Sequence, residues 1–188
     1  MQKGFTLLEI VIAAGIIGIL ALILIPLAVN ELGKADVTKA QGDINGLISA
    51  ITHFREDTKE YPDRRDSRTA DYYHFLYTGD SSTMPKVPSS WGTRSDRVFN
   101  HLKINGRGYR RWDNTLLIGW HGPYLDRDSL DPWGKGYLVG VRAFWDKSNT
   151  YYAWILSAGK NGVVETNLTS QNIPPGSDDI GRWIYISR

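Results

Sequence analysis

A run of twenty residues, from Ile10 to Val29, carries no charged and no strongly polar side chain. At about 1.5 Å of rise per residue, a helix of this length spans roughly 30 Å, which is the thickness of the hydrocarbon core of a bilayer. Nearly all the charge of the 188-residue chain follows this run. The run therefore predicts a membrane helix followed by one polar domain of ordinary size.

A cleaved secretory signal is the alternative for this run, because Lys3 precedes it as the basic residue of such signals does. However, the run is longer than the roughly 7–15 apolar residues of a signal core. No small-x-small cleavage pattern follows Val29, and a helical pattern continues into residues 30–54. We therefore expect the helix to be retained in the mature protein.

Two residues of the apolar segment require explanation. A carboxylate buried in lipid without a partner costs several kcal/mol, so Glu9 predicts either a partner or a position at the headgroup level. Pro26 removes a backbone N–H from the helix interior and crowds the preceding turn. We expect a kink or a locally melted turn at Pro26.

The segment KGFTLLE, residues 3–9, resembles the class III signal of the type IV pilin superfamily, which includes the pseudopilins. The resemblance implies that a prepilin peptidase cuts between Gly4 and Phe5 and methylates the new N-terminus. It also implies that the Glu9 carboxylate pairs with the mature N-terminal amine of a neighbouring subunit as a helical filament assembles. Two charges that are costly alone in a low dielectric attract strongly when paired.

Beyond the membrane segment, apolar residues recur at the spacing of one helix face. These residues are Ile44, Leu47, Ile48, Ile51 and Phe54. Proline restricts the residue before it, so we expect the helix to end at Tyr61-Pro62. The predicted organisation is a leader at 1–4, a membrane and filament-core helix at 5–29, an amphipathic helix at 30–62 and a globular domain at 63–188.

Residues 63–111 form a loop-rich stretch with ten basic and five acidic residues. With Trp91, Tyr109 and Trp112, this stretch could follow phosphates and stack on bases. Mixed charges are normal on a solvated surface, so we do not expect nucleic acid as a partner. We expect the arginines to bridge to neighbouring subunits. Short apolar groups, around residues 72–76 and 98–104, predict a small helix or strands within the stretch.

Three later segments are rich in aromatic and β-branched residues, namely LLIGW (116–120), YLVGVRAFW (137–145) and YYAWILSAG (151–159). Residues 145–150 between the last two predict a hairpin connection. Short strands after one long helix indicate an α+β fold, with a small antiparallel sheet packed on the amphipathic half of the helix.

Four short motifs in this domain are similar, in order, to those of the major pseudopilins of type II secretion systems. They are GPYL (122–125), DPWG (131–134), SAGKNG (157–162) and DDIGRW (178–183). The resemblance implies a filament subunit that crosses the bacterial inner membrane once, with its C-terminal domain in the periplasm. It also implies minor pseudopilins and an inner-membrane assembly platform as partners.

Two other functions stay open at this point. A type IV pilin of a surface pilus, for adhesion, motility or DNA uptake, would carry the same signal. A membrane-anchored module that binds polysaccharide is a more distant alternative, prompted by the seven tryptophans. Most of these tryptophans are expected in the core and sheet.

The chain has no cysteine, which excludes a disulfide framework and a thiolate metal site. The resemblance implies a calcium ion in the last loop, held by Ser157 and Asn161 on one side and by Asp178 or Asp179 on the other. Calcium prefers carboxylate, amide and carbonyl oxygens. Asn161 stands where the family usually has aspartate, and Glu165 could add a carboxylate. The alternative is a loop without metal, in which Asp179 accepts backbone amides.

The sequence shows no pattern typical of an enzyme. Its four histidines are scattered without a pair at i, i+4, and it contains neither G-x-S-x-G nor a Walker sequence. We therefore expect a structural subunit rather than a catalyst.

Overall fold

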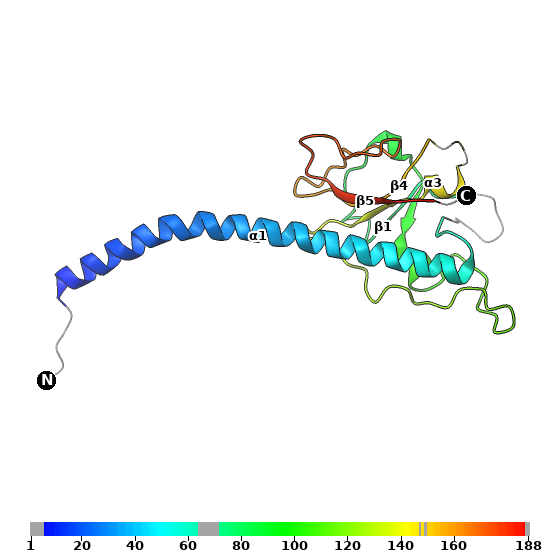
Figure 1. The fold of residues 1–188 in the computed structure, drawn as a ribbon, viewed down its shortest axis with the longest axis horizontal. Helices are drawn as coiled ribbons and strands as arrows, with labels where there is room; N and C mark the ends of the chain where they lie inside the picture. Colours follow the sequence, from blue (N-terminus) through cyan, green and yellow to red (C-terminus); the bar gives the residue numbers. More distant parts are fainter. Residues whose placement is uncertain (1–5, 64–71, 147, 149, 187–188) are drawn as a thin grey trace. The chain divides into compact units, whose positions relative to one another are not determined.

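The computed structural model describes residues 6–63, 72–146, 148 and 150–186 and divides into two compact units, Met1–Thr38 and Lys39–Arg188. The helix α1 (Leu7–Thr58) begins in the first unit and ends in the second. The second unit then contains β1 (Phe75–Tyr77), η1 (Ser89–Trp91), β2 (Ser95–Arg97), α2 (Val98–Leu102), β3 (Leu138–Gly140), α3 (Arg142–Trp145), β4 (Ala153–Ser157) and β5 (Ile180–Ile184) (Figure 1). This is the α+β fold that the sequence predicts.

The helix α1 continues without interruption through Pro26, so the prediction of a melted turn there is wrong. A proline removes one backbone hydrogen bond, and long apolar helices tolerate that loss through adjustments of the neighbouring turns. The apolar side chains before Thr38 are exposed along this part of the helix. It is the one helix, within the described part of the chain, that is long and apolar enough to cross a membrane.

The C-terminal end of α1 lies at Thr58, slightly before the predicted end at Tyr61-Pro62. Lys59 adopts a left-handed conformation with φ 58°, and its N–H donates to the carbonyl of Arg55 at 2.8 Å. The Thr58 hydroxyl donates to the carbonyl of Phe54 at 2.7 Å. The left-handed residue therefore ends the helix before the proline can.

The five strands form one sheet in the order β2-β1-β3-β4-β5. β1 pairs with β2 in parallel, with Phe75 opposite Ser95, whereas β3, β4 and β5 pair antiparallel to their neighbours. The prediction of an antiparallel sheet is therefore correct for three of the four pairings and wrong for one. The parallel pair joins two strands of the 63–111 stretch, whose pairing depends on the chain that crosses between them.

The predicted strands are confirmed only in part. Residues 151–159 contain β4 as predicted. In residues 137–145, β3 ends at Gly140 and α3 follows. The connection from β3 to β4 is therefore longer than the expected hairpin and includes α3. Residues 116–120 form a turn closed by isolated bridges. Leu117 in this turn has φ 50°, which no β-strand accommodates.

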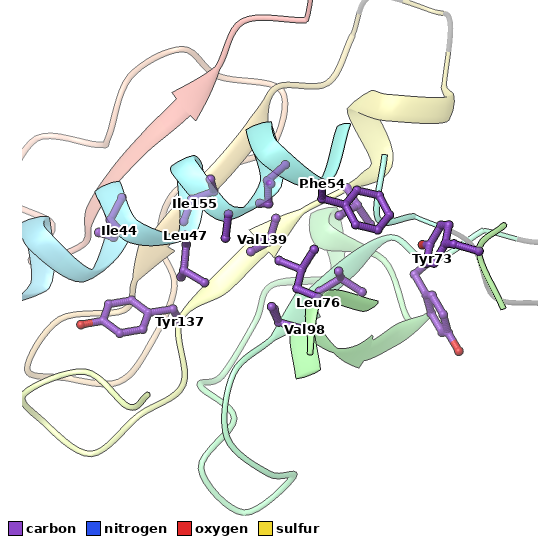
Figure 2. Packing of buried hydrophobic residues seen from close by; sticks show 14 of the residues in the cluster. Ile44, Leu47, Phe54, Tyr73, Leu76, Val98, Tyr137, Val139 and Ile155 are labelled. Atoms are coloured by element: carbon purple, nitrogen blue, oxygen red, sulfur yellow. The ribbon is translucent and has the colours of Figure 1, made fainter. Parts of the chain in front are cut away.

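The core lies between α1 and one face of the sheet, as the periodicity of α1 predicts. Ile44, Leu47 and Phe54 of α1 face Val139 of β3 and Ile155 of β4 (Figure 2). Alternate residues of the same strands point to the opposite face, where a second cluster gathers around Trp91 and Leu168. Both faces of β3 and β4 are consequently buried.

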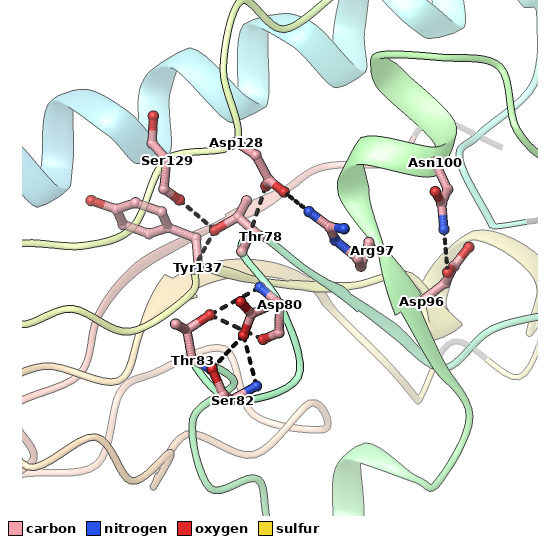
Figure 3. A network of polar contacts seen from close by, with 11 residues as sticks. Thr78, Asp80, Ser82, Thr83, Asp96, Arg97, Asn100, Asp128, Ser129 and Tyr137 are labelled. Carbon is pink, nitrogen blue, oxygen red and sulfur yellow. Dashed lines mark hydrogen bonds and ion pairs between the residues drawn. The ribbon is translucent and has the colours of Figure 1, made fainter.

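The 63–111 stretch is bound to the domain by polar contacts within the same subunit. Arg97 forms an ion pair with Asp128 at 2.5 Å, and the Thr78 hydroxyl donates to the carbonyl of Ser129 (Figure 3). Within the stretch itself, Arg107 pairs with Asp96. Arg97 and Arg107 therefore have carboxylate partners within the chain, and bridges from the arginines to neighbouring subunits stay a prediction.

Candidate assembly and metal-binding sites

Glu9 lies at the third position of α1 and forms a capping box with Thr6. Its Oε2 accepts hydrogen bonds from the backbone N–H of Thr6 at 2.8 Å and from the Thr6 hydroxyl at 2.9 Å. The Glu9 N–H donates to the Thr6 hydroxyl at 3.3 Å. Glu9 therefore has a local partner, which the T-x-x-E spacing could have predicted.

The other carboxylate oxygen of Glu9, Oε1, accepts no hydrogen bond from the described residues. Glu9 also lines an apolar depression together with Ile10, Ala13, Ala14 and Ile17. Gly4 and Phe5, the predicted processing residues, lie outside the described residues. One Glu9 oxygen thus stays available for a cation in apolar surroundings.

Two motif tyrosines attach the domain to the second half of α1. Tyr124 of the GPYL motif donates to Asp57 at 2.9 Å, and Tyr137, three residues after the DPWG motif, donates to Asp43 at 2.8 Å. Burial raises the pKa of both hydroxyls, and their carboxylate partners raise it further. These motif segments therefore position the helix against the sheet.

The Ser157 hydroxyl forms no hydrogen bond with the other predicted calcium ligands. Ser157 is buried in β4, and its hydroxyl donates to Oδ2 of Asp131 at 2.6 Å. The other oxygen of Asp131 accepts the backbone N–H groups of Trp133 and Lys135. Ser157 thus holds the DPWG loop in place.

The remaining predicted ligands lie together in the last loop. The Asn161 N–H donates to Oδ2 of Asp178 at 2.9 Å, and the Asn161 side-chain amide donates to Glu165. The loop also contains Ser177, whose hydroxyl donates to Glu165 at 2.6 Å. A Cβ at Gly159, which has φ 61°, would lie 2.2 Å from the Asp178 carbonyl oxygen, so the close approach of Asp178 requires glycine.

One carboxylate oxygen of Asp179 makes the amide contacts expected of a loop without metal. The other oxygen takes no part in these contacts. Oδ2 of Asp179 accepts the N–H groups of Glu165 and Thr166 and the Thr166 hydroxyl. Oδ1 of Asp179 and Oδ1 of Asp178 are both buried and have no hydrogen-bond partner among the described residues. Burial raises the pKa of Asp179, although the Thr166 hydrogen bonds oppose this.

Two buried carboxylate oxygens without donors fit a hard cation, since such an ion binds oxygen ligands and compensates their lost hydration. No group of three or more His, Cys, Asp or Glu residues stands ready for a metal within the described ranges. A cation in this loop would therefore need carbonyl, amide or water oxygens besides Asp178 and Asp179.

A polar network in the 63–111 stretch escaped the sequence analysis. His101 is fully buried, with Nε2 at 3.1 Å from Asp96 and Nδ1 at 2.7 Å from the Tyr109 hydroxyl. Arg107 and Asn100 also donate to Asp96. The spacing of these residues in the sequence does not predict the cluster. His101 is completely buried, so a substrate cannot reach it.

Comparisons with known proteins find matches for the N-terminal segment and for most of the chain. Residues 1–25 match the prokaryotic N-terminal methylation motif. The type II secretion system core protein G of Pectobacterium carotovorum subsp. carotovorum is 43% identical over 182 residues, which cover 97% of this chain and 85% of that protein. The chain belongs to the type II secretion system core protein G family, the major pseudopilins.

Other core protein G sequences extend the likeness over nearly the whole chain. The protein of Dickeya chrysanthemi is 41% identical over 182 residues, with 97% of this chain and 86% of that protein covered. The protein of Klebsiella michiganensis is 28% identical over 183 residues, with 97% and 93% covered. No solved structure gives a significant match. With its apolar α1, this core protein G chain is a membrane-anchored protein.

Proposed function

We propose that this chain is the main structural subunit of a type II secretion pseudopilus. Family membership carries the proposal. The exposed apolar half of α1 supports it, because such a surface needs either lipid or apolar helices of other copies to cover it. The same helix can serve as a membrane anchor before assembly and as a filament core afterwards.

In this proposal, a prepilin peptidase removes residues 1–4 and methylates Phe5. The Glu9 carboxylate then receives the N-terminal amine of a neighbouring copy, for which Oε1 is available. The anchored protein lies in the bacterial inner membrane with residues 39–188 in the periplasm. Minor pseudopilins and an inner-membrane assembly platform are the proposed partners, and filament growth moves secreted proteins.

Intact mass spectrometry of the protein from cells with and without the peptidase tests the processing step. We expect the peptidase to remove the first four residues and add one methyl group. An intact N-terminus, or a cut beyond Val29, would contradict the proposal.

Replacing Glu9 with Ala should abolish filaments while the protein still inserts into the membrane, because an amine in apolar surroundings loses its counter-charge. The matched control is Thr6→Ala, which removes the capping hydroxyl but keeps the carboxylate. We expect Thr6→Ala filaments to form, with helix stability reduced by roughly 1 kcal/mol. Filament yield in sheared fractions measures both variants. Normal filaments from Glu9→Ala would refute the pairing.

We also propose that the last loop binds calcium through Asp178 and Asp179, with carbonyl, amide or water oxygens completing the coordination. The buried, unpaired Oδ1 atoms of both aspartates support this. Bound calcium would neutralise carboxylates that share one loop and crosslink its two sides. The Ser157 hydroxyl and the Asn161 amide have protein partners, so their role as ligands stays a prediction.

Calcium should raise the melting temperature of the full chain in detergent relative to a chelator control. At a free concentration about 100-fold above Kd, the gain is about 2.7 kcal/mol, which corresponds to several degrees. Asp178→Asn with Asp179→Asn should abolish the shift, whereas Asp126→Asn, an exposed residue outside the loop, should preserve it. No calcium shift in the parent chain would favour the loop without metal.

A further inference from the structure

A groove with an aromatic lining lies at the β5 edge of the sheet, outside every site described above. It has a volume of about 360 Å³, within the range of roughly 300–1,000 Å³ of small-molecule sites. Tyr151 and Tyr152, which lead into β4, contribute rings, as do Trp183 of β5 and Tyr185 just after it. None of the described residues that line the groove carries a charge.

Contacts within the chain hold three of these rings in place. The rings of Tyr152 and Trp183 meet edge to face with centroids 5.4 Å apart, and the Gln171 amide donates to the Tyr152 hydroxyl at 2.9 Å. The guanidinium of Arg142 lies over the Tyr151 ring at 4.0 Å. Tyr185, by contrast, is 77% exposed. The groove thus combines positioned aromatic surfaces with one ring that a ligand could cover.

The indole of Trp183 differs from most tryptophans of the chain. Five indole N–H groups donate to protein oxygens, those of Trp91, Trp112, Trp120, Trp145 and Trp154. Trp183 has no such acceptor among the described residues and lines the groove. It therefore offers a free donor beside apolar rings.

We propose that this groove binds a neutral glycan. A pyranose presents C–H groups on one face, which pack on aromatic rings, and hydroxyls at its edge, which exchange hydrogen bonds with an indole N–H, a phenol and an amide. The lining carries no charge, and the nearby Arg142 guanidinium is already paired with Asp146 at 3.5 Å. The described residues at the groove therefore offer no unpaired cation that would favour phosphates or acidic sugars over a neutral sugar. In a filament, many copies would present the groove and raise avidity for a long polysaccharide.

Full-length protein in a zwitterionic detergent tests the proposal on a printed array of neutral oligosaccharides of glucose, galactose, mannose and N-acetylglucosamine. Alkyl glycoside detergents are avoided, since their sugar heads compete. We expect binding to at least one neutral series, confirmed in solution by calorimetry with the same oligosaccharide. Absence of binding to every neutral series would overturn the proposal.

Tyr185→Ala should weaken that binding by about tenfold or more, because it removes an exposed stacking surface with little effect on folding. Trp183→Phe keeps a ring, removes the donor and should weaken binding less. Trp112→Ala, which removes a tryptophan bonded to Asn114 outside the groove, is the matched control and should bind normally. Equal binding by Tyr185→Ala would overturn the assignment.

Filament formation by the same variants separates this inference from the proposed function. We expect Tyr185→Ala to form filaments normally. If it blocks filaments and the parent chain binds no glycan, the groove is an interface between copies, and the glycan proposal is wrong while the filament function stands.

Discussion

At the scale of single residues, the function of each carboxylate depends on the hydrogen bonds that it accepts. Asp96 is buried and receives hydrogen bonds from His101, Arg107 and Asn100. Burial alone would raise the pKa of Asp96, but the hydrogen bonds from these partners together hold it well below the ordinary value. Glu9, in contrast, uses one oxygen locally and leaves the other free.

Asp96→Ala should reduce the free energy of unfolding by about 3–5 kcal/mol, since it leaves the buried His101 and the partly buried Arg107 without their carboxylate acceptor. Denaturant titration followed by tryptophan fluorescence measures this, because all seven tryptophans lie in residues 39–188. The exposed Asp126 serves as control, and Asp126→Ala should change stability by less than about 0.5 kcal/mol. Similar stabilities for both variants would refute a structural role for the network.

At the scale of elements, the second half of α1 packs against the sheet and contributes one side of the domain core. Its apolar face was predictable, because a helix repeats every 3.6 residues whatever lies opposite. What lies opposite was predictable only in part: β4 was expected, but the parallel β1–β2 pair and the turn at 116–120 were not. Strand pairing depends on partners distant in the chain, which local composition does not specify.

Phe54→Ala should destabilise the domain by about 3–5 kcal/mol. Phe54 is fully buried, and its ring lies 4.8 Å from that of Tyr109 and 5.5 Å from that of Tyr124. The loss therefore affects the packing of the 63–111 stretch and of the GPYL motif together. Ile104→Ala, at a side chain that is 54% exposed, is the control and should cost well under 1 kcal/mol. Equal midpoints in urea would contradict this packing.

At the scale of the whole molecule, the chain combines a unit with an exposed apolar surface and a unit with a closed core. In the proposed function, lipid covers this apolar surface before assembly and other copies of the chain cover it in the filament. The predicted calcium loop, the buried network and the aromatic groove all belong to residues 39–188. The effect of a substitution in residues 39–188 on stability can therefore be measured separately from its effect on assembly.

The melting temperature of the domain should fall as the pH drops from 7 to 5. Burial lowers the pKa of His101, and burial with Arg142 and Arg94 lowers that of His74, both below the ordinary 6.5. The unfolded chain then binds more protons than the folded one, so stability is lost as pH falls below about 6.5.

The Asn variant of His74 isolates one part of this pH effect. His74 Nδ1 accepts the N–H groups of Thr93 and Arg94, and an asparagine oxygen can replace it as acceptor. We expect His74→Asn to reduce the change in melting temperature between pH 7 and 5. A parent chain whose melting temperature rises over this range would contradict the assignment.

The sequence by itself determined the membrane helix, the signal segment with Glu9 and the buried face of α1. These features depend on apolar segments, helical periodicity and short motifs, all of which are formed by residues close together in the sequence. Only the tertiary structure decided that Ser157 holds Asp131, that His101 and Arg107 meet on Asp96, and that Trp183 keeps a free indole N–H. Each of these contacts depends on segments that the fold brings together, and the free energy of burial that selects them belongs to the packed domain as a whole.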